Sequence, residues 1–211
     1  MFFDIDDALT STDSISRIIS HINELKSDAL IFSYFRQKVG SEEKQYYQAP
    51  PWEIWSTAYN LQFMKANDIR CGLTFRIRED AFLTACLYSV PNVYTKFIDD
   101  PYYIYADGRA TSTLNSDFAS YSSENDLKEA LKFWQEFQDW QCEGKTYFTV
   151  FDLLLQTICG CLKCLTINTR HNYKDSITAI KQIFEQQSTQ EPKINIYCLT
   201  WYNDLNSINL G

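Results

Sequence analysis

The chain has 211 residues, of which 27 are acidic and 19 are basic, so its formal net charge is −8. With 45% hydrophobic and 22% charged residues it is too apolar for a disordered segment, and it lacks the run of about 20 apolar residues that a membrane-spanning helix needs. This length suits a single globular domain over 1–211, whose core needs no disulfide or metal.

Hydrophobic periodicity predicts the elements of the first half of the chain. Isoleucines recur at helical spacing from Ile15, so residues 12–26 are expected to form an amphipathic helix. The further expectations, in chain order, are a covered strand over 29–36, a polar loop over 40–48, a helix from Pro50 to about Asn67, a half-buried strand over 70–78, a short helix over 79–89 and a short strand over 102–106.

The second half of the chain is predicted to be mostly helical. A capping pattern from Ser123 to Asp126 begins a helix that ends near Gly144. Residues 149–166 are apolar nearly all round, which indicates a buried helix. A helix over 175–187 and a last strand over 193–202 follow. The predicted fold class is α+β, with a small mixed or antiparallel sheet of about four strands packed against five to six helices and a helical layer over roughly 123–187.

A cysteine cluster invites a zinc-site hypothesis, with Cys159, Cys161 and Cys164 joined by His171. On a helix each residue advances by about 100°, so Cys159 points away from the other two and three ligands cannot converge. The cysteines are therefore interpreted as buried structural residues, and no metal is expected.

Other catalytic signatures are missing from the sequence. His21 and His171 are its two histidines, and neither lies in a recognisable nucleophile motif. The six glycines are too far apart for a phosphate-binding loop, so no nucleotide cofactor is expected. The acidic pair Glu79-Asp80 fits the first turn of a helix. We therefore expect no catalytic residue and no cofactor, and a protein that is not an enzyme.

Two segments that are expected to be exposed loops combine acids with paired tyrosines. Tyrosine is enriched in protein interfaces, and carboxylates complement basic groups on a partner. The alternative is that these loops are solvated and their tyrosines fold back on the domain. The candidate partner-binding residues are Glu42, Glu43, Tyr46, Tyr47, Asp99, Asp100, Tyr102 and Tyr103.

The functional hypothesis is a non-catalytic acidic protein that binds a basic protein partner. Its most concrete form is an immunity protein that neutralises a toxin, such as a nuclease, by blocking the active-site cleft. Negative charge disfavours direct binding of nucleic acid and of anionic membranes. Seven cysteines without an export signal favour a reducing, cytoplasmic location.

Two alternatives remain from the sequence. One is a hydrolase or transferase whose site combines scattered acids, Arg76 or Arg78, and a tyrosine or cysteine. The other is a viral or bacterial adaptor that binds through an apolar groove.

Overall fold

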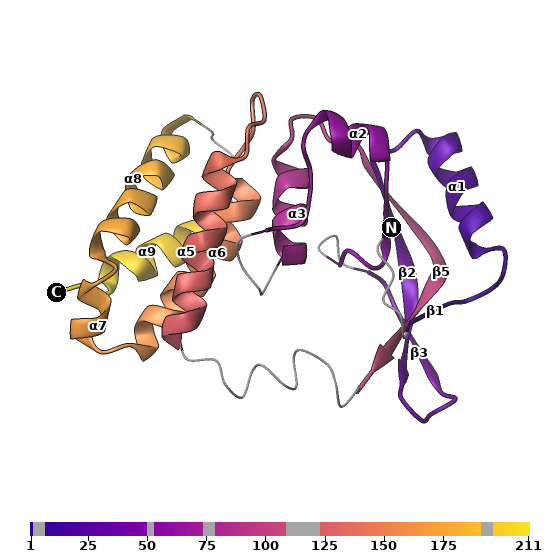
Figure 1. Cartoon of the computed structure of the whole chain (residues 1–211), viewed down its shortest axis with the longest axis horizontal. Helices are drawn as coiled ribbons and strands as arrows, with labels where there is room; N and C mark the ends of the chain where they lie inside the picture. The colour runs from indigo at the N-terminus through magenta and orange to yellow at the C-terminus, as the bar shows by residue number, and fades with distance from the viewer. Residues whose placement is uncertain (2–6, 50–52, 74–78, 109–122, 191–195) are drawn as a thin grey trace. The chain divides into compact units, whose positions relative to one another are not determined.

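The structure is a computed structural model that describes residues 1, 7–49, 53–73, 79–108, 123–190 and 196–211 (Figure 1). The chain divides into two compact units: Met1–Arg70 with Asn92–Ser120, here the sheet unit, and Cys71–Pro91 with Tyr121–Gly211, here the helical unit. The described residues form a mixed sheet and several helices, which confirms the predicted α+β class. That 1–211 is one domain stays a prediction.

The sheet unit is built on two long central strands. Its strands are β1 (Ala8–Leu9), β2 (Ala29–Lys38), β3 (Lys44–Tyr47), β4 (Thr57–Tyr59) and β5 (Thr95–Asp107). The order is β1-β5-β2-β3, and β4 also pairs with β2. β2 and β5 run parallel, whereas the other pairs are antiparallel. Leu30 and Phe32 of β2 are fully buried, which confirms the predicted covered strand.

A bulge interrupts the pairing of β2 with β5. Phe32 is paired with Ile98 and Tyr34 with Tyr103, so four residues of β5 lie opposite Ser33 alone. Pro101 lies in this bulge, where its missing N–H breaks no ladder hydrogen bond. The bulge therefore displaces Asp99 and Asp100 from the regular ladder.

The described part of the sheet unit contains the helices α1 (Ser14–Leu25) and α2 (Leu61–Ala66). α1 lies along β2 and β5, and it buries Ile18 in the core that these strands share (Figure 1). The helix predicted from Pro50 to Asn67 is wrong over most of its described length, because part of that segment pairs as β4 with β2 and α2 is the helical part among its described residues. Asn60 caps α2 by accepting hydrogen bonds from the backbone of Gln62 and Phe63.

The helical unit is centred on one buried helix. Its helices are α3 (Glu79–Ser89), α5 (Ser123–Asp139), α6 (Phe148–Cys164), α7 (Ile167–His171), α8 (Lys174–Gln190) and α9 (Ile196–Ser207). α6 packs against α3, α5 and α9, and Leu155, Ile158 and Leu162 are fully buried, as predicted for an all-apolar helix.

One predicted strand is wrong here, and a second can be compared with the structure only in part. The strand expected over 193–202 is wrong, since α9 begins at Ile196 and buries Leu205; residues 191–195 lie outside the described chain. Residues 70–73 of the strand expected over 70–78 do not pair with any strand of the sheet. Residues 74–78 lie outside the described residues. In the described part of the chain, every helix falls short of the length or the apolar content that crossing a bilayer requires.

Candidate functional site

The tyrosines of both acidic segments lie in strands of the sheet and not in loops. Tyr46 and Tyr47 belong to β3 and pair with Phe35 and Tyr34 of β2, so the predicted polar loop over 40–48 is wrong in this part. Pairing with β2 satisfies the backbone hydrogen bonds of this segment. This strand therefore depends on a partner elsewhere in the chain, which the polar composition of the segment does not indicate. The exposed acids Glu42 and Glu43 precede β3, whereas Asp99, Asp100, Tyr102 and Tyr103 lie within β5.

Asp99 is bound to side chains of its own sheet. Its Oδ1 accepts hydrogen bonds from the hydroxyls of Ser33, at 2.9 Å, and of Tyr46. Gln48 Nε2 lies 3.5 Å from the same oxygen. The bond from Tyr46 is the main cause that lowers the pKa of the Asp99 carboxyl. The Asp99 carboxylate is therefore hydrogen-bonded to neighbouring side chains on the surface of the sheet.

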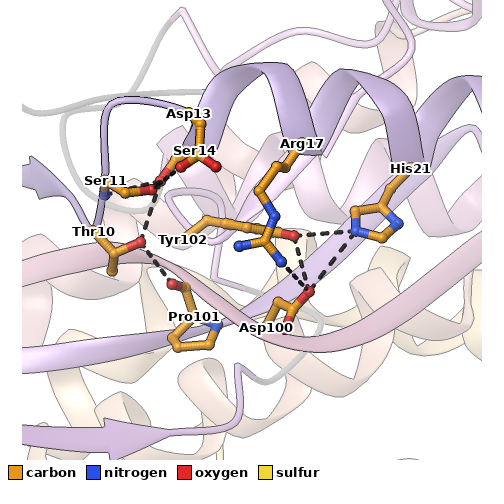
Figure 2. A network of polar contacts seen from close by, with 9 residues as sticks. All are labelled: Thr10, Ser11, Asp13, Ser14, Arg17, His21, Asp100, Pro101 and Tyr102. Atoms are coloured by element: carbon orange, nitrogen blue, oxygen red, sulfur yellow. Dashed lines mark hydrogen bonds and ion pairs between the residues drawn. The ribbon is translucent and has the colours of Figure 1, made fainter.

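Asp100 contacts two side chains of α1, Arg17 and His21, as Figure 2 shows. Its Oδ2 accepts from Arg17 Nη2 at 3.1 Å and from the Tyr102 hydroxyl at 2.9 Å. His21 Nε2 lies 3.8 Å from Oδ2 and 3.1 Å from the Tyr102 hydroxyl. The Arg17 guanidinium also lies over the Tyr102 ring, 5.1 Å from its centre. Burial, and then Asp100, raise the pKa of Tyr102 to about 12.

A hydroxyl-rich turn holds the start of α1 against the bulge of β5. The Thr10 hydroxyl donates to the carbonyl of Pro101 at 2.8 Å, and the backbone N–H of Ser11 donates to Ser14 Oγ at 3.1 Å (Figure 2). These contacts fix where Arg17 stands relative to Asp100.

Tyr103 belongs to the core of the sheet unit. Its side chain is fully buried, and its hydroxyl donates to the buried carboxylate of Asp7, which also accepts from the backbone N–H of Ala106 at 2.8 Å. Tyr102 is buried as well. The sequence analysis left open, as the alternative to partner binding, that the tyrosines of these segments fold back on the domain. The role of these acids and tyrosines in binding a partner stays a prediction.

Sequence reasoning missed a second cluster, which surrounds Glu53. The backbone carbonyl of Glu53 accepts from the hydroxyls of Ser56 and Thr57, at 3.2 and 3.0 Å, and this turn directs its side chain at β2. The Tyr34 hydroxyl donates to Glu53 Oε1 at 3.3 Å, while the buried Oε2 has no hydrogen-bond partner. Burial raises the pKa of Glu53 to about 7, although Tyr34 and then Arg36 lower it.

Aromatic rings stack in a row beside Glu53, with the Arg36 guanidinium in the middle. It lies 5.2 Å from the centre of the Tyr47 ring and 5.6 Å from that of Tyr105. Tyr47 stacks on Tyr34 at 5.6 Å, and Tyr105 stacks on Trp55 at 5.3 Å. Residues two apart on a strand share a face, so the spacing of Tyr34 and Arg36 was the available signal. No comparable signal in the sequence pointed to Glu53, because the pattern of its segment predicts a helix.

The other candidates from the sequence do not converge on a site. Among described residues, no group of three His, Cys, Asp or Glu side chains could hold a metal ion. Cys159 is buried and its thiol donates to the carbonyl of Trp201 at 3.2 Å, as expected for a structural cysteine. Asp80 lies in the first turn of α3, as predicted. Arg76 and Arg78 fall outside the described residues.

The helical unit contains an open groove of about 430 Å³ between α5 and α6. Ser123, Asp126, Gln156 and Gly160 are among the residues that line it. No basic side chain is among its lining residues, so the combination of acid, arginine and tyrosine occurs beside Glu53 and not here.

No protein-family model and no curated protein matches the sequence. Among solved structures, the fold resembles S. aureus TarS 1–349, which was crystallised in complex with UDP-GlcNAc. The TM-score is 0.55 at 16% sequence identity, and the match covers 99% of this chain and 66% of that chain. The likeness concerns the fold. It contradicts the prediction of a non-catalytic immunity protein that inhibits a toxin.

Proposed function

We propose that the protein is a transferase that uses a nucleotide-activated sugar, with Glu53 as its acid–base group. The fold supports the class of reaction, because the similar chain of TarS was solved with UDP-GlcNAc bound. The Glu53 carboxyl carries the proposal, since one of its oxygens is buried and unpaired and its pKa is about 7. A base is most effective when its pKa lies near the operating pH.

In the proposed reaction, Glu53 acts on the acceptor hydroxyl. The ionised carboxylate takes the hydroxyl proton while the acceptor oxygen forms a bond to the anomeric carbon of the sugar. The bond from that carbon to the diphosphate breaks, and the nucleoside diphosphate leaves with the electron pair. In this proposal Tyr34 holds the carboxyl through Oε1, and the buried Oε2, which has no hydrogen-bond partner, takes the proton.

The substrate is the finer part of the proposal. UDP-GlcNAc is the first donor to test, because it is bound in the similar structure. The chain spans 66% of the length of that neighbour, so the donor, the acceptor and the activity itself remain proposals for this chain.

The test measures UDP release from UDP-GlcNAc in the presence of water, added alcohols and monosaccharides. Assays are run with and without Mg²⁺, which commonly binds to substrate phosphates. We expect slow turnover by the wild type and a loss of about 10²- to 10⁴-fold in Glu53→Gln, with binding of UDP-GlcNAc retained. Glu42→Gln is the matched control, since Glu42 is an exposed acid of the same unit.

Two results would contradict the proposal. One is a wild-type protein that binds no UDP-GlcNAc at millimolar concentration. The other is a Glu53→Gln variant that turns over as fast as the wild type and the Glu42→Gln control.

A further inference from the structure

The Arg36 guanidinium makes cation–π stacking contacts with two tyrosine rings. Its Cζ atom lies 5.2 Å from the centre of the Tyr47 ring of β3 and 5.6 Å from the centre of the Tyr105 ring of β5. Arg36 is on β2, between these two strands. Such stacking orders the planar group without using any of its five N–H donors.

Among the described residues, no hydrogen bond to this guanidinium is formed. Its Nε is buried and without a hydrogen-bond partner, and Asp107 Oδ2 lies 3.8 Å from it. The side chain as a whole is 39% exposed, so a ligand can approach the part of the guanidinium that faces solvent, although not the buried Nε. Arg17 makes the contrast, because it stacks on Tyr102 in the same way but is bonded to Asp100 at 3.1 Å.

We propose that Arg36 is the anchor for a phosphate group of a ligand. Within the proposed function, on which this assignment rests, that group is the diphosphate of the nucleotide sugar. A planar fork with free N–H groups matches two phosphate oxygens at once, and the tyrosine rings set its orientation before the ligand binds. The anchor therefore binds the part of the donor that leaves, whereas Glu53 acts on the acceptor.

The Asp107 carboxylate competes with this ligand for the Arg36 guanidinium. Its carboxylate is half-exposed and lies 3.8 Å from Arg36, too far for a hydrogen bond but close enough to attract the cation. An incoming phosphate must replace this attraction. Removing the Asp107 charge therefore strengthens binding of the ligand.

Calorimetric titrations of the full chain with UDP-GlcNAc and with inorganic pyrophosphate test the anchor. They are run below pH 7, so that most of the Glu53 carboxyl is protonated. We expect Arg36→Lys to bind both ligands about 10- to 100-fold more weakly, because lysine keeps the charge but loses the fork. The matched control Arg17→Lys is expected to bind both ligands as the wild type does.

A second variant keeps the test independent of changes at Arg36 itself. Asp107→Asn is expected to bind both ligands up to about five-fold more tightly, the range that an exposed ion pair allows. Circular dichroism and thermal melting establish that each variant is folded. If Arg36→Lys binds as the wild type does, if Arg17→Lys loses as much affinity, or if Asp107→Asn weakens binding, the anchor is refuted.

The ligands separate this inference from the proposed function. Binding of pyrophosphate that depends on Arg36, without binding of UDP-GlcNAc, refutes the function and supports the anchor. Binding of UDP-GlcNAc that is indifferent to Arg36→Lys supports the function and refutes the anchor. Binding of neither ligand refutes both.

Discussion

The Tyr34 hydroxyl donates a 3.3 Å hydrogen bond to Glu53 Oε1, and this bond joins strand β2 to the turn that precedes β4. Glu53 would otherwise place a carboxyl against the aromatic side chains of the sheet with neither oxygen paired. The bond favours the ionised form of the carboxyl, while burial opposes it.

Replacing Tyr34 by phenylalanine removes this bond. We expect Tyr34→Phe to raise the pKa of Glu53 further above its usual value, because burial remains and the stabilising donor is lost. The protein should lose about 1 kcal/mol of stability. A carboxyl-carbon NMR titration of Glu53 measures the pKa, and urea unfolding measures the stability. A Glu53 pKa that falls, or stays unchanged, contradicts the expected electrostatics.

The raised pKa of Glu53 also predicts how stability depends on pH. The folded state keeps the Glu53 proton up to about pH 7, whereas the unfolded chain loses it near the ordinary glutamate pKa of 4.5. The folded state thus binds more protons between these values, so the contribution of Glu53 to stability falls as pH rises from about 4.5 to 7.

Glu53→Gln isolates this contribution. We expect the variant to gain stability relative to the wild type as pH rises through this window, by about 1 to 2 kcal/mol after allowance for solvent screening of a half-buried group. Urea unfolding at pH 4 and at pH 8 measures the difference, with Glu42→Gln as the control. Parallel pH profiles of the wild type and Glu53→Gln would show that Glu53 titrates normally.

Lys145 stabilises the end of α5 in the helical unit. Its Nζ donates to the carbonyls of Phe137, at 3.0 Å, and of Trp140, and it lies 5.1 Å from the centre of the Phe137 ring. Burial lowers its pKa. We expect Lys145→Met to cost about 1.5 to 3 kcal/mol, because helix-end carbonyls lose a charged donor.

The control for Lys145 is Lys132→Met. Lys132 pairs with Glu129 at 2.7 Å, but its side chain is 52% exposed, so its loss should cost less than about 1 kcal/mol. Chemical denaturation of both variants compares the two costs. Equal losses would mean that the contacts of Lys145 with the carbonyls contribute nothing specific.

The cysteines of α6 should differ in reactivity. Cys164 is exposed, whereas Cys159 is buried and burial raises its pKa to about 11. We expect iodoacetamide at pH 8 to alkylate Cys164 in the native protein and to leave Cys159 unmodified, because the thiolate is the reactive form. Peptide mapping by mass spectrometry measures the modification, and a denatured sample, in which both react, is the control. Rapid native labelling of Cys159 would contradict its structural role.

The proposed site shows the limit of reading local patterns. Arg36 and Tyr34 could be placed on one strand face from their spacing, but Glu53 was assigned to a helix by the aromatic periodicity around it. Pairing of β4 with β2 overrode that periodicity. Asp99 and Asp100 stand out as acids beside tyrosines, yet no local pattern indicates that Ser33 and Arg17 bind them.

Local hydrophobic patterns were enough to predict the α+β class, the amphipathic helix α1, the covered strand β2 and the buried helix α6, since each follows from a hydrophobic period that local geometry imposes. The tertiary structure alone decided that β3 and β4 are strands, that α9 is a helix and that Glu53 lies against Tyr34. Strand pairing and burial join residues that are far apart in the chain. These long-range contacts stabilise the segments without producing a hydrophobic period in their sequences, so local patterns do not predict them.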